Sequence, residues 1–367
     1  MTSERQSGQL LTGPVLVVGA GLLGTSIGLA LRRRGIEVLL RDVSPQNLTI
    51  ATGVGAGRDA DDPSVGSTDI QLVVVAVPPD HLAQEIARAL VGTTAAVTDV
   101  GSVKGSPVRA VADLVSDGEL RRYVGSHPMA GSERSGPFAA SPALFDGRPW
   151  AVTPHPTSDE SAADLVGDLV RTCGALPVTL TPEEHDAAVA RTSHLPHLLA
   201  ALAAGRLTLG PPEHLALSGQ GIRDVTRIAA GDPALWQQII AANADAVSEL
   251  LEAVRGDIDV LLDAVRSGRR DGVRALLARG VEGTAAIPGK HGGPTEPMAA
   301  LYVAVPDHPG ELARLLADAG DIGVNVEDLR IDHDPGRPVG LVELTVAAER
   351  AVFLQEALER RGWTTHR

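Results

Sequence analysis

The sequence predicts an α/β protein of three domains, and three observations support this prediction. Between residues 14 and 180, short apolar runs alternate with helical patterns, as in a doubly wound parallel sheet with helices on both faces. Residues 182–286 contain long Ala/Leu-rich helical segments. After a Pro/Gly-rich linker at 287–297, residues 298–367 follow the order strand, helix, strand, strand, helix, strand.

Six apolar runs supply the strands of the sheet domain, which spans residues 1–181. These runs are 14–18, 37–41, 71–77, 95–100, 148–153 and 176–180. Most of them are continuously apolar, because a parallel strand between two helical layers is buried on both sides. The sequence therefore predicts strands that do not alternate apolar and polar residues.

The second domain, residues 182–286, is expected to be all-helical. Its pattern breaks near 208–214 and again at "GDPALW", where Asp232 can cap a helix that has Pro233 as its first residue. From 235 to 278 it stays helical with few breakers. Extended Ala/Leu helices that cover one side of a sheet domain often supply a dimer face, so we expect a homodimer.

The third domain, residues 298–367, predicts a ferredoxin-like βαββαβ unit. Its expected strands are 300–305, 324–331 and 339–346 with a short last strand, and its expected helices are 310–319 and 349–361.

Composition excludes several classes of function. Aromatic residues make up 2% of the 367 residues and the formal charge is −14, which argues against a nucleic-acid partner. The single cysteine, Cys173, is expected to be a small buried side chain and fits a reducing compartment. The N-terminus lacks an apolar signal region, and no run reaches about 18 apolar residues. These features predict a soluble cytoplasmic protein without a membrane partner.

A glycine-rich turn follows the first expected strand. In "VLVVGAGLLGTSIG", Gly19, Gly21 and Gly24 form the G-x-G-x-x-G pattern of a Rossmann-type dinucleotide site. Helix N–H groups after this turn can bind a pyrophosphate. The predicted cofactor-binding residues are Gly19, Gly21, Leu22, Leu23, Gly24 and Asp42.

Asp42 ends the second expected strand and favours NAD over NADP. Its carboxylate can accept hydrogen bonds from the ribose hydroxyls and would repel a 2′-phosphate. The neighbouring Arg41 leaves NADP open, because an arginine at this place can turn toward such a phosphate.

Two polar phrases follow neighbouring strands: "VTDVGSVKGSPV" at 97–108 and "GSHPMAGSERSGPF" at 125–138. Ligands of doubly wound sheets bind beyond the carboxyl ends of the strands. His127, with an ordinary pKa near 6.5, is the candidate base for oxidising an alcohol, and Ser102 can align imidazole and hydroxyl. Lys104 can contact a phosphate or carboxylate, or can cap a carbonyl.

Four phrases in order resemble the TyrA family, the prephenate and arogenate dehydrogenases of tyrosine biosynthesis. They are the glycine turn with "LLGTS", then "DVGSVKG", "GSHPMAGSERSG", and "RTSHLPHLLA" followed by "IRDVTRIAAGDPALW". The resemblance implies that His127 is the base for the ring C4 hydroxyl and that Ser102 bridges them. It implies that Arg227 holds the ring carboxylate and that His197 lines the side-chain end of the pocket. His194 is expected to support helix packing.

The resemblance also implies the reaction. NAD would take the hydride from prephenate, and loss of CO₂ would give 4-hydroxyphenylpyruvate; arogenate, which would give tyrosine, stays open as the substrate. One rival is a 3-hydroxy acid dehydrogenase, which typically uses a lysine in the helical domain, whereas Lys104 and Lys290 lie outside it. Another is a non-catalytic NAD and amino-acid sensor.

The segment "LYVAVPDHPGELARLLADAGDIGVNVEDLRI" resembles an ACT domain, a regulatory fold that commonly binds amino acids between paired copies. Gly310 would open its helix and Asn325 would lie near a tyrosine effector. The alternative is a dimerisation module without a ligand.

Two further features of the helical domain have simple interpretations. His194 and His197 lie three residues apart, but without an H-E-x-x-H motif or a cysteine cluster we expect no metal site. Trp236 is expected in core or dimer-interface packing.

Overall fold

The computed structural model describes residues 10–63, 69–130, 136–287, 297–333 and 339–366. The chain forms two compact units, Met1–Arg255 and Gly256–Arg367. Most of the expected linker, and residues 131–135 of the "GSHPMAGSERSG" phrase, lie outside the described residues. Within the described ranges, no helix combines the length and the apolar character needed to cross a membrane.

Two sheets make up the α/β part of the first unit. Five parallel strands have the order β3-β2-β1-β4-β5: β1 (Val15–Val18), β2 (Val38–Arg41), β3 (Arg58–Asp59), β4 (Leu72–Val75) and β5 (Ala96–Asp99). Three more strands have the order β6-β7-β8: β6 (Gly125–Pro128), β7 (Pro149–Thr153) and β8 (Leu176–Thr179). β7 is antiparallel to β6 and parallel to β8.

All six predicted strands are present, and β3 and β6 are additional. β6 has the sequence GSHP, whose Gly and Pro give no strand pattern. Contacts with β5 hold it in place: Val124 N–H donates to the Val97 carbonyl at 3.0 Å, and a parallel bridge pairs Val97 with Tyr123. The two sheets are thus joined at β5 and β6.

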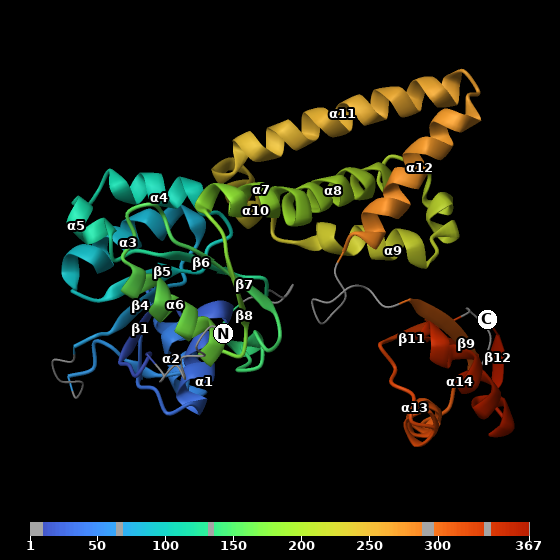
Figure 1. Ribbon diagram of the computed structural model, residues 1–367, viewed down its shortest axis with the longest axis horizontal. Helices are drawn as coiled ribbons and strands as arrows, with labels where there is room; N and C mark the ends of the chain where they lie inside the picture. Colours follow the sequence, from blue (N-terminus) through green and yellow to red (C-terminus); the bar gives the residue numbers. More distant parts are fainter. Residues whose placement is uncertain (1–9, 64–68, 131–135, 288–296, 334–338, 367) are drawn as a thin grey trace, which may run out of the picture. The chain divides into compact units, whose positions relative to one another are not determined.

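Helices cover both faces of the five-stranded sheet (Figure 1). Val15 and Val17 of β1 belong to the core that includes α1 (Leu22–Arg33), α2 (Pro45–Gly53) and α6 (Glu160–Thr172). Leu16 belongs to the opposite core, with α3 (Pro79–Gly92) and α4 (Gly105–Ala112). Alternate residues of one apolar strand therefore fill two cores, which confirms the prediction of two-sided burial. Two short elements complete this part: α5 (Asp117–Leu120) and the 3₁₀ turn η1 (Pro137–Ala139).

The chain then becomes all-helical, as predicted. The elements are α7 (Pro182–Val189), the π-helical turn η2 (Ala190–His194), α8 (Leu195–Leu207), the 3₁₀ turns η3 (Pro212–Leu217) and η4 (Ile228–Ala230), α9 (Gln220–Arg227), α10 (Pro233–Ala242), α11 (Ala244–Arg266) and α12 (Arg270–Ala285). Asp232 caps α10 by accepting the Ala234 N–H at 3.0 Å, as the sequence indicated. α11 runs across the boundary between the two units.

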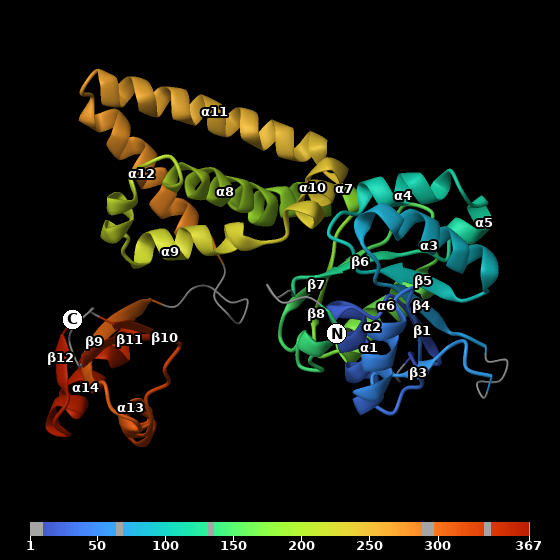
Figure 2. The same ribbon diagram turned by 180° about the vertical axis from the view of Figure 1, so that it is seen from behind.

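The C-terminal residues form the predicted βαββαβ arrangement. Its elements are β9 (Met298–Pro306), α13 (Glu311–Asp321), β10 (Asp328–His333), β11 (Val339–Ala347), α14 (Ala348–Arg360) and β12 (Thr364–His366). The antiparallel sheet has the ferredoxin-like order β10-β11-β9-β12. Leu315 of α13 and Leu354 of α14 pack with Leu301 and Leu344 in one core, so both helices cover the same face (Figure 2).

Candidate active site

The glycine turn between β1 and α1 provides a cradle for a phosphate group. Gly19 has φ +102°, and a Cβ there would collide with the carbonyl of Ala76; a Cβ on Gly24 would collide with the carbonyl of Gly19. A Cβ on Gly21 would meet no protein atom within 4 Å. Two glycines are therefore required by the protein's own packing, while the third leaves open space in front of the helix N-terminus. Leu22 and Leu23, the first residues of α1, are half-buried beside it.

Asp42 connects this turn to the end of β2. Its Oδ2 accepts the Ala20 N–H at 2.5 Å and its Oδ1 accepts the Ser44 N–H at 2.7 Å. The neighbouring Arg41 forms an ion pair with Asp61, with 2.7 Å between the guanidinium and the carboxylate. This ion pair occupies the Arg41 guanidinium, the group that could otherwise bind the 2′-phosphate of NADP.

His127 is the third residue of β6, near the carboxyl end of that strand. Its Nδ1 is 3.0 Å from Nε2 of His185, and the two rings meet edge to face with centroids 5.2 Å apart. Burial lowers the pKa of His127 well below its ordinary value, and the charges of His185, Lys104 and His194 lower it further. The ring is consequently neutral at pH 7, with one nitrogen able to accept a proton.

Ser102 and Lys104 lie in the loop between β5 and α4. Ser102 is half-buried, whereas Lys104 is completely buried and forms an ion pair with Asp99. The Lys104 ammonium also donates to the Ser126 carbonyl at 2.7 Å, one residue before His127. This placement fits the carbonyl-capping alternative for Lys104, because a buried, paired ammonium cannot reach a substrate.

The Lys104 network fixes β6 against β5. Tyr123 donates its hydroxyl to Asp99 at 2.8 Å, and the Ser126 hydroxyl donates to the Asp99 carbonyl at 2.7 Å. Burial lowers the pKa of Lys104, and Asp99 opposes that shift. The strand end that presents His127 is thereby held by a buried, hydrogen-bonded ion pair.

The helical part contributes a second group of rings. His197 of α8 stacks on Trp236 of α10, with centroids 3.6 Å apart and planes at 11°. His194 meets the edge of the same indole at 6.1 Å. Burial lowers the pKa of His197, while a hydrogen bond to the backbone of Ile228 opposes the shift. Ile228 directly follows Arg227, which ends α9 with an exposed side chain.

His185 and Asp186 of α7 connect the two groups, and sequence reasoning missed both. Asp186 accepts from His185 Nδ1 at 2.9 Å, and its carbonyl accepts from the amide of Asn243 at 2.9 Å; that amide also lies 3.2 Å from His194 Nδ1. A helical signal was available in the sequence. Residues 182, 185, 186 and 189 share one buried face of α7, directly after the capping box of Thr181 and Glu184.

The two residues assigned to regulation lie in the second unit. Gly310 has φ +94° and precedes α13 as its N-cap, and Asn325 donates to the carboxylate of Glu327. Neither residue belongs to the first unit, which contains His127 and the glycine turn.

Comparisons with known proteins agree on one family. The family described as "Prephenate dehydrogenase, nucleotide-binding domain" matches residues 27–188, and "Prephenate dehydrogenase, dimerization domain" matches residues 181–279. A probable prephenate dehydrogenase of Streptomyces niveus is 39% identical over 95% of this chain and 98% of its own length. The prephenate dehydrogenase of Bacillus subtilis is 30% identical over 86% of this chain and 87% of its own length.

Solved structures give the same result for the fold. A prephenate dehydrogenase from Aquifex aeolicus, in complex with hydroxyphenyl propionate and NAD⁺, has a TM-score of 0.65 and 28% identity, and the match covers 74% of this chain and 96% of that one. Arogenate dehydrogenase from Synechocystis has a TM-score of 0.63 and 25% identity, with 74% of this chain and 99% of that one covered.

Proposed function

This chain belongs to the prephenate dehydrogenase family, an NAD-dependent oxidoreductase family, and we propose that it converts prephenate to 4-hydroxyphenylpyruvate and CO₂. The observation that carries the proposal is His127: a half-buried imidazole near the carboxyl end of β6, with Nδ1 3.0 Å from His185 and with its pKa lowered by desolvation. Oxidising an alcohol requires a base of this kind together with a hydride acceptor.

Bound NAD⁺ supplies the hydride acceptor. The residues of this chain fit such a group, since Gly21 leaves open space before α1 and Asp42 ends β2. The ion pair of Arg41 with Asp61 supports NAD over NADP, because it occupies the guanidinium that would otherwise meet a 2′-phosphate.

The base and its neighbour act on the ring hydroxyl. His127 accepts the hydroxyl proton, and Ser102, at the adjoining strand end, holds the hydroxyl and the imidazole in register. The ring carboxylate then leaves as CO₂, and the ring becomes aromatic, which makes the reaction effectively irreversible. The residues need to orient and deprotonate the substrate, and the driving force lies in the substrate itself.

Because the chain has a formal charge of −14, it needs local cations to bind an anionic substrate. Arg227 can bind the ring carboxylate with two parallel hydrogen bonds. His197, flat against Trp236 and next to the segment that carries Arg227, is suited to the side-chain end of the substrate. Arogenate is the alternative substrate, because it differs from prephenate only at that side chain.

Assays of the purified protein with prephenate and with arogenate, each with NAD⁺ or NADP⁺, test the proposal. We expect turnover of prephenate with NAD⁺, and His127→Asn should lower kcat by about 10²–10⁴ while NAD⁺ affinity is retained. NAD⁺ binding without turnover of either substrate would favour the non-catalytic sensor instead. Full activity of the His127→Asn variant would remove the base assignment.

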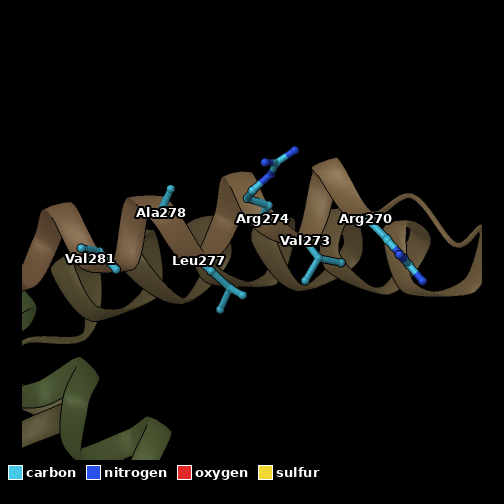
Figure 3. Close-up of a pocket in the computed structure, with 6 residues that line it drawn as sticks. All are labelled: Arg270, Val273, Arg274, Leu277, Ala278 and Val281. Atoms are coloured by element: carbon cyan, nitrogen blue, oxygen red, sulfur yellow. The ribbon is translucent and has the colours of Figure 1, made fainter.

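We also propose that the chain is a homodimer and that α12 contributes to its interface. Leu277 and Val281 of α12 are 62% and 69% exposed, and with Val273 and Ala278 they line a shallow hollow of about 490 Å³. Figure 3 shows Val273 and Leu277 pointing to the same side of the helix. An exposed apolar stripe of this kind is typical of a protein interface.

For the C-terminal βαββαβ unit we propose an ACT-like role as a binding site for tyrosine. Its strand order and the left-handed Gly310 before α13 support this role, with Asn325 near the effector. Deletion of residues 298–367 should then leave turnover intact and abolish inhibition by tyrosine. A truncated protein that remains equally sensitive to tyrosine would refute the role.

A further inference from the structure

We propose that His185 and Asp186 are positioning residues that hold His127 in one tautomer, with Nδ1 protonated and Nε2 free to accept a proton. The inference rests on the proposed function, in which His127 is the base. It assigns a role to two buried residues of α7 that the proposed reaction leaves unused. His185 is 1% exposed and Asp186 is 9% exposed.

The three side chains form one hydrogen-bonded row. His127 Nδ1 lies 3.0 Å from His185 Nε2, and His185 Nδ1 lies 2.9 Å from Oδ1 of Asp186. Both nitrogens of His185 are thus engaged. One nitrogen of His127 is engaged in this row, which leaves Nε2 for the substrate.

Asp186 sets the direction of the row. Its Oδ1 also accepts the N–H of Lys104 at 2.8 Å, and its Oδ2 accepts the N–H of Gly105 at 2.8 Å. These are backbone donors at the start of α4, where the helix dipole favours a negative charge. An oxygen that accepts from fixed N–H groups cannot donate, so His185 Nδ1 must be the donor in its bond to Asp186.

The remaining protons follow by elimination. The proposed arrangement takes His185 as neutral: with its proton on Nδ1, it carries a lone pair on Nε2, which can only accept. His127 Nδ1 must then donate to it, and neutral His127 carries its own lone pair on Nε2. With His185 neutral, the other tautomer of neutral His127 would place two lone pairs between the rings.

The positive charge that forms on His127 gives a second argument for the role of Asp186. When His127 takes up a proton, it becomes a half-buried cation. The nearby charges of His185, the Lys104 ammonium and His194 lower its pKa, so all three disfavour the cation unless a carboxylate balances it. Asp99 is already paired with Lys104. Asp186 is the carboxylate that the row connects to His127, through His185, so it stabilises the imidazolium as it forms.

Two variants test this role: one replaces Asp186 and the other replaces His185. Asp186→Asn removes the charge and the fixed acceptor, and we expect kcat to fall by about 10²–10⁴, as when the carboxylate that orients a catalytic histidine is replaced by an amide. His185→Phe keeps a ring but removes both hydrogen bonds, and we expect a fall of at least about tenfold. In both variants KM for prephenate and for NAD⁺ should change by less than about threefold.

The matched control is Thr181→Ala. It removes the cap of the same helix, where the Thr181 hydroxyl accepts the Glu184 N–H at 3.1 Å, but leaves the row untouched. A cap costs about 1 kcal/mol of stability, so this variant reports what loosening α7 does to turnover. If Thr181→Ala lowers kcat as much as Asp186→Asn, the role of the row is structural and the proposal is wrong.

Nitrogen NMR of labelled histidine gives a readout that does not depend on turnover. In the unaltered protein at pH 7, His127 should show a protonated Nδ1 and an unprotonated Nε2, and His185→Phe should give a mixture of tautomers. A His127 ring with the proton on Nε2 in the unaltered protein would overturn the proposal. Failure of the proposed function would appear instead as absent turnover with this tautomer in place.

Discussion

The sheet part and the helical part of the first unit bury very different side chains. In the sheet part, Trp150, Phe145 and Leu31 are completely buried in a continuous apolar core. In α8, the buried residues are His197 and Ala200, while Leu202 is 58% exposed. Farther along the helical part, Leu217 is 88% exposed.

The difference indicates how each part is stabilised. The sheet part packs two continuous apolar cores within one chain, which is the ordinary basis of an independently stable domain. The helical part holds its interior with polar and aromatic contacts, such as Asn243 to Asp186 and His197 to Trp236, and leaves leucines outside. Such a part is suited to forming a site and to meeting a partner.

The largest expected effect is on the free energy of unfolding, and it differs between one residue of the sheet part and one of the helical part. Trp150→Ala should reduce the free energy of unfolding by about 3–5 kcal/mol, because it leaves a cavity and removes the hydrogen bond from the indole to Ser126. Leu217→Ala should change it by less than about 0.5 kcal/mol within the monomer. Urea denaturation of both variants measures this difference. Equal losses would contradict the contrast between the two parts.

The next effect concerns the exposed apolar side chains themselves. Leu277→Asp combined with Val281→Asp should dissociate the homodimer, because each buried, unpaired polar group costs about 2–3 kcal/mol at an interface. Val91→Asp on α3 is the matched control, since Val91 is 63% exposed but belongs to the sheet part. Sedimentation velocity should show monomers for the first variant only. Dimers that persist in both would place the interface elsewhere.

The smallest effect is a pH dependence that belongs to the helical part. Burial lowers the pKa of His194 to about 4, so between pH 6.5 and 4 the unfolded chain binds a proton there that the folded chain does not. The stability that this group contributes is therefore complete above pH 6.5 and is lost progressively as the pH falls toward 4. His194→Gln should flatten the unfolding free energy over this range. An unchanged profile would show that His194 is not responsible.

Sequence reasoning found the strands with a strong apolar signal and missed those without one. The run LVVV of β4 is buried at every position and is recognisable as a strand. GSHP of β6 is defined by its bonds to β5, which have no counterpart in local sequence. The strand that carries the candidate base was therefore recognised as a motif but not as a strand.

The candidate site shows the same limit. Ser102, Lys104 and His127 were expected together because they follow neighbouring strands; the structure joins Lys104 to the Ser126 carbonyl, next to His127, and the place of Ser102 in the site stays a prediction. That Lys104 faces inward toward Asp99 could not be predicted, because loop residues have no periodicity from which to infer direction. His185 and Asp186 were hidden in the charged run "PEEHD", although their helical spacing pointed inward.

The π-helical turn η2 lies between the residues of α7 and those of α8 that the site uses. Such a turn accommodates one residue more than an α-helix of the same rise. Deleting a single residue between 190 and 193 would rotate all of α8 by about 100° about its axis. His197 would then lose its stacking on the Trp236 indole while His185 kept its place. The extra residue of the π-helical turn therefore sets the orientation of His197 relative to His185 about the helix axis.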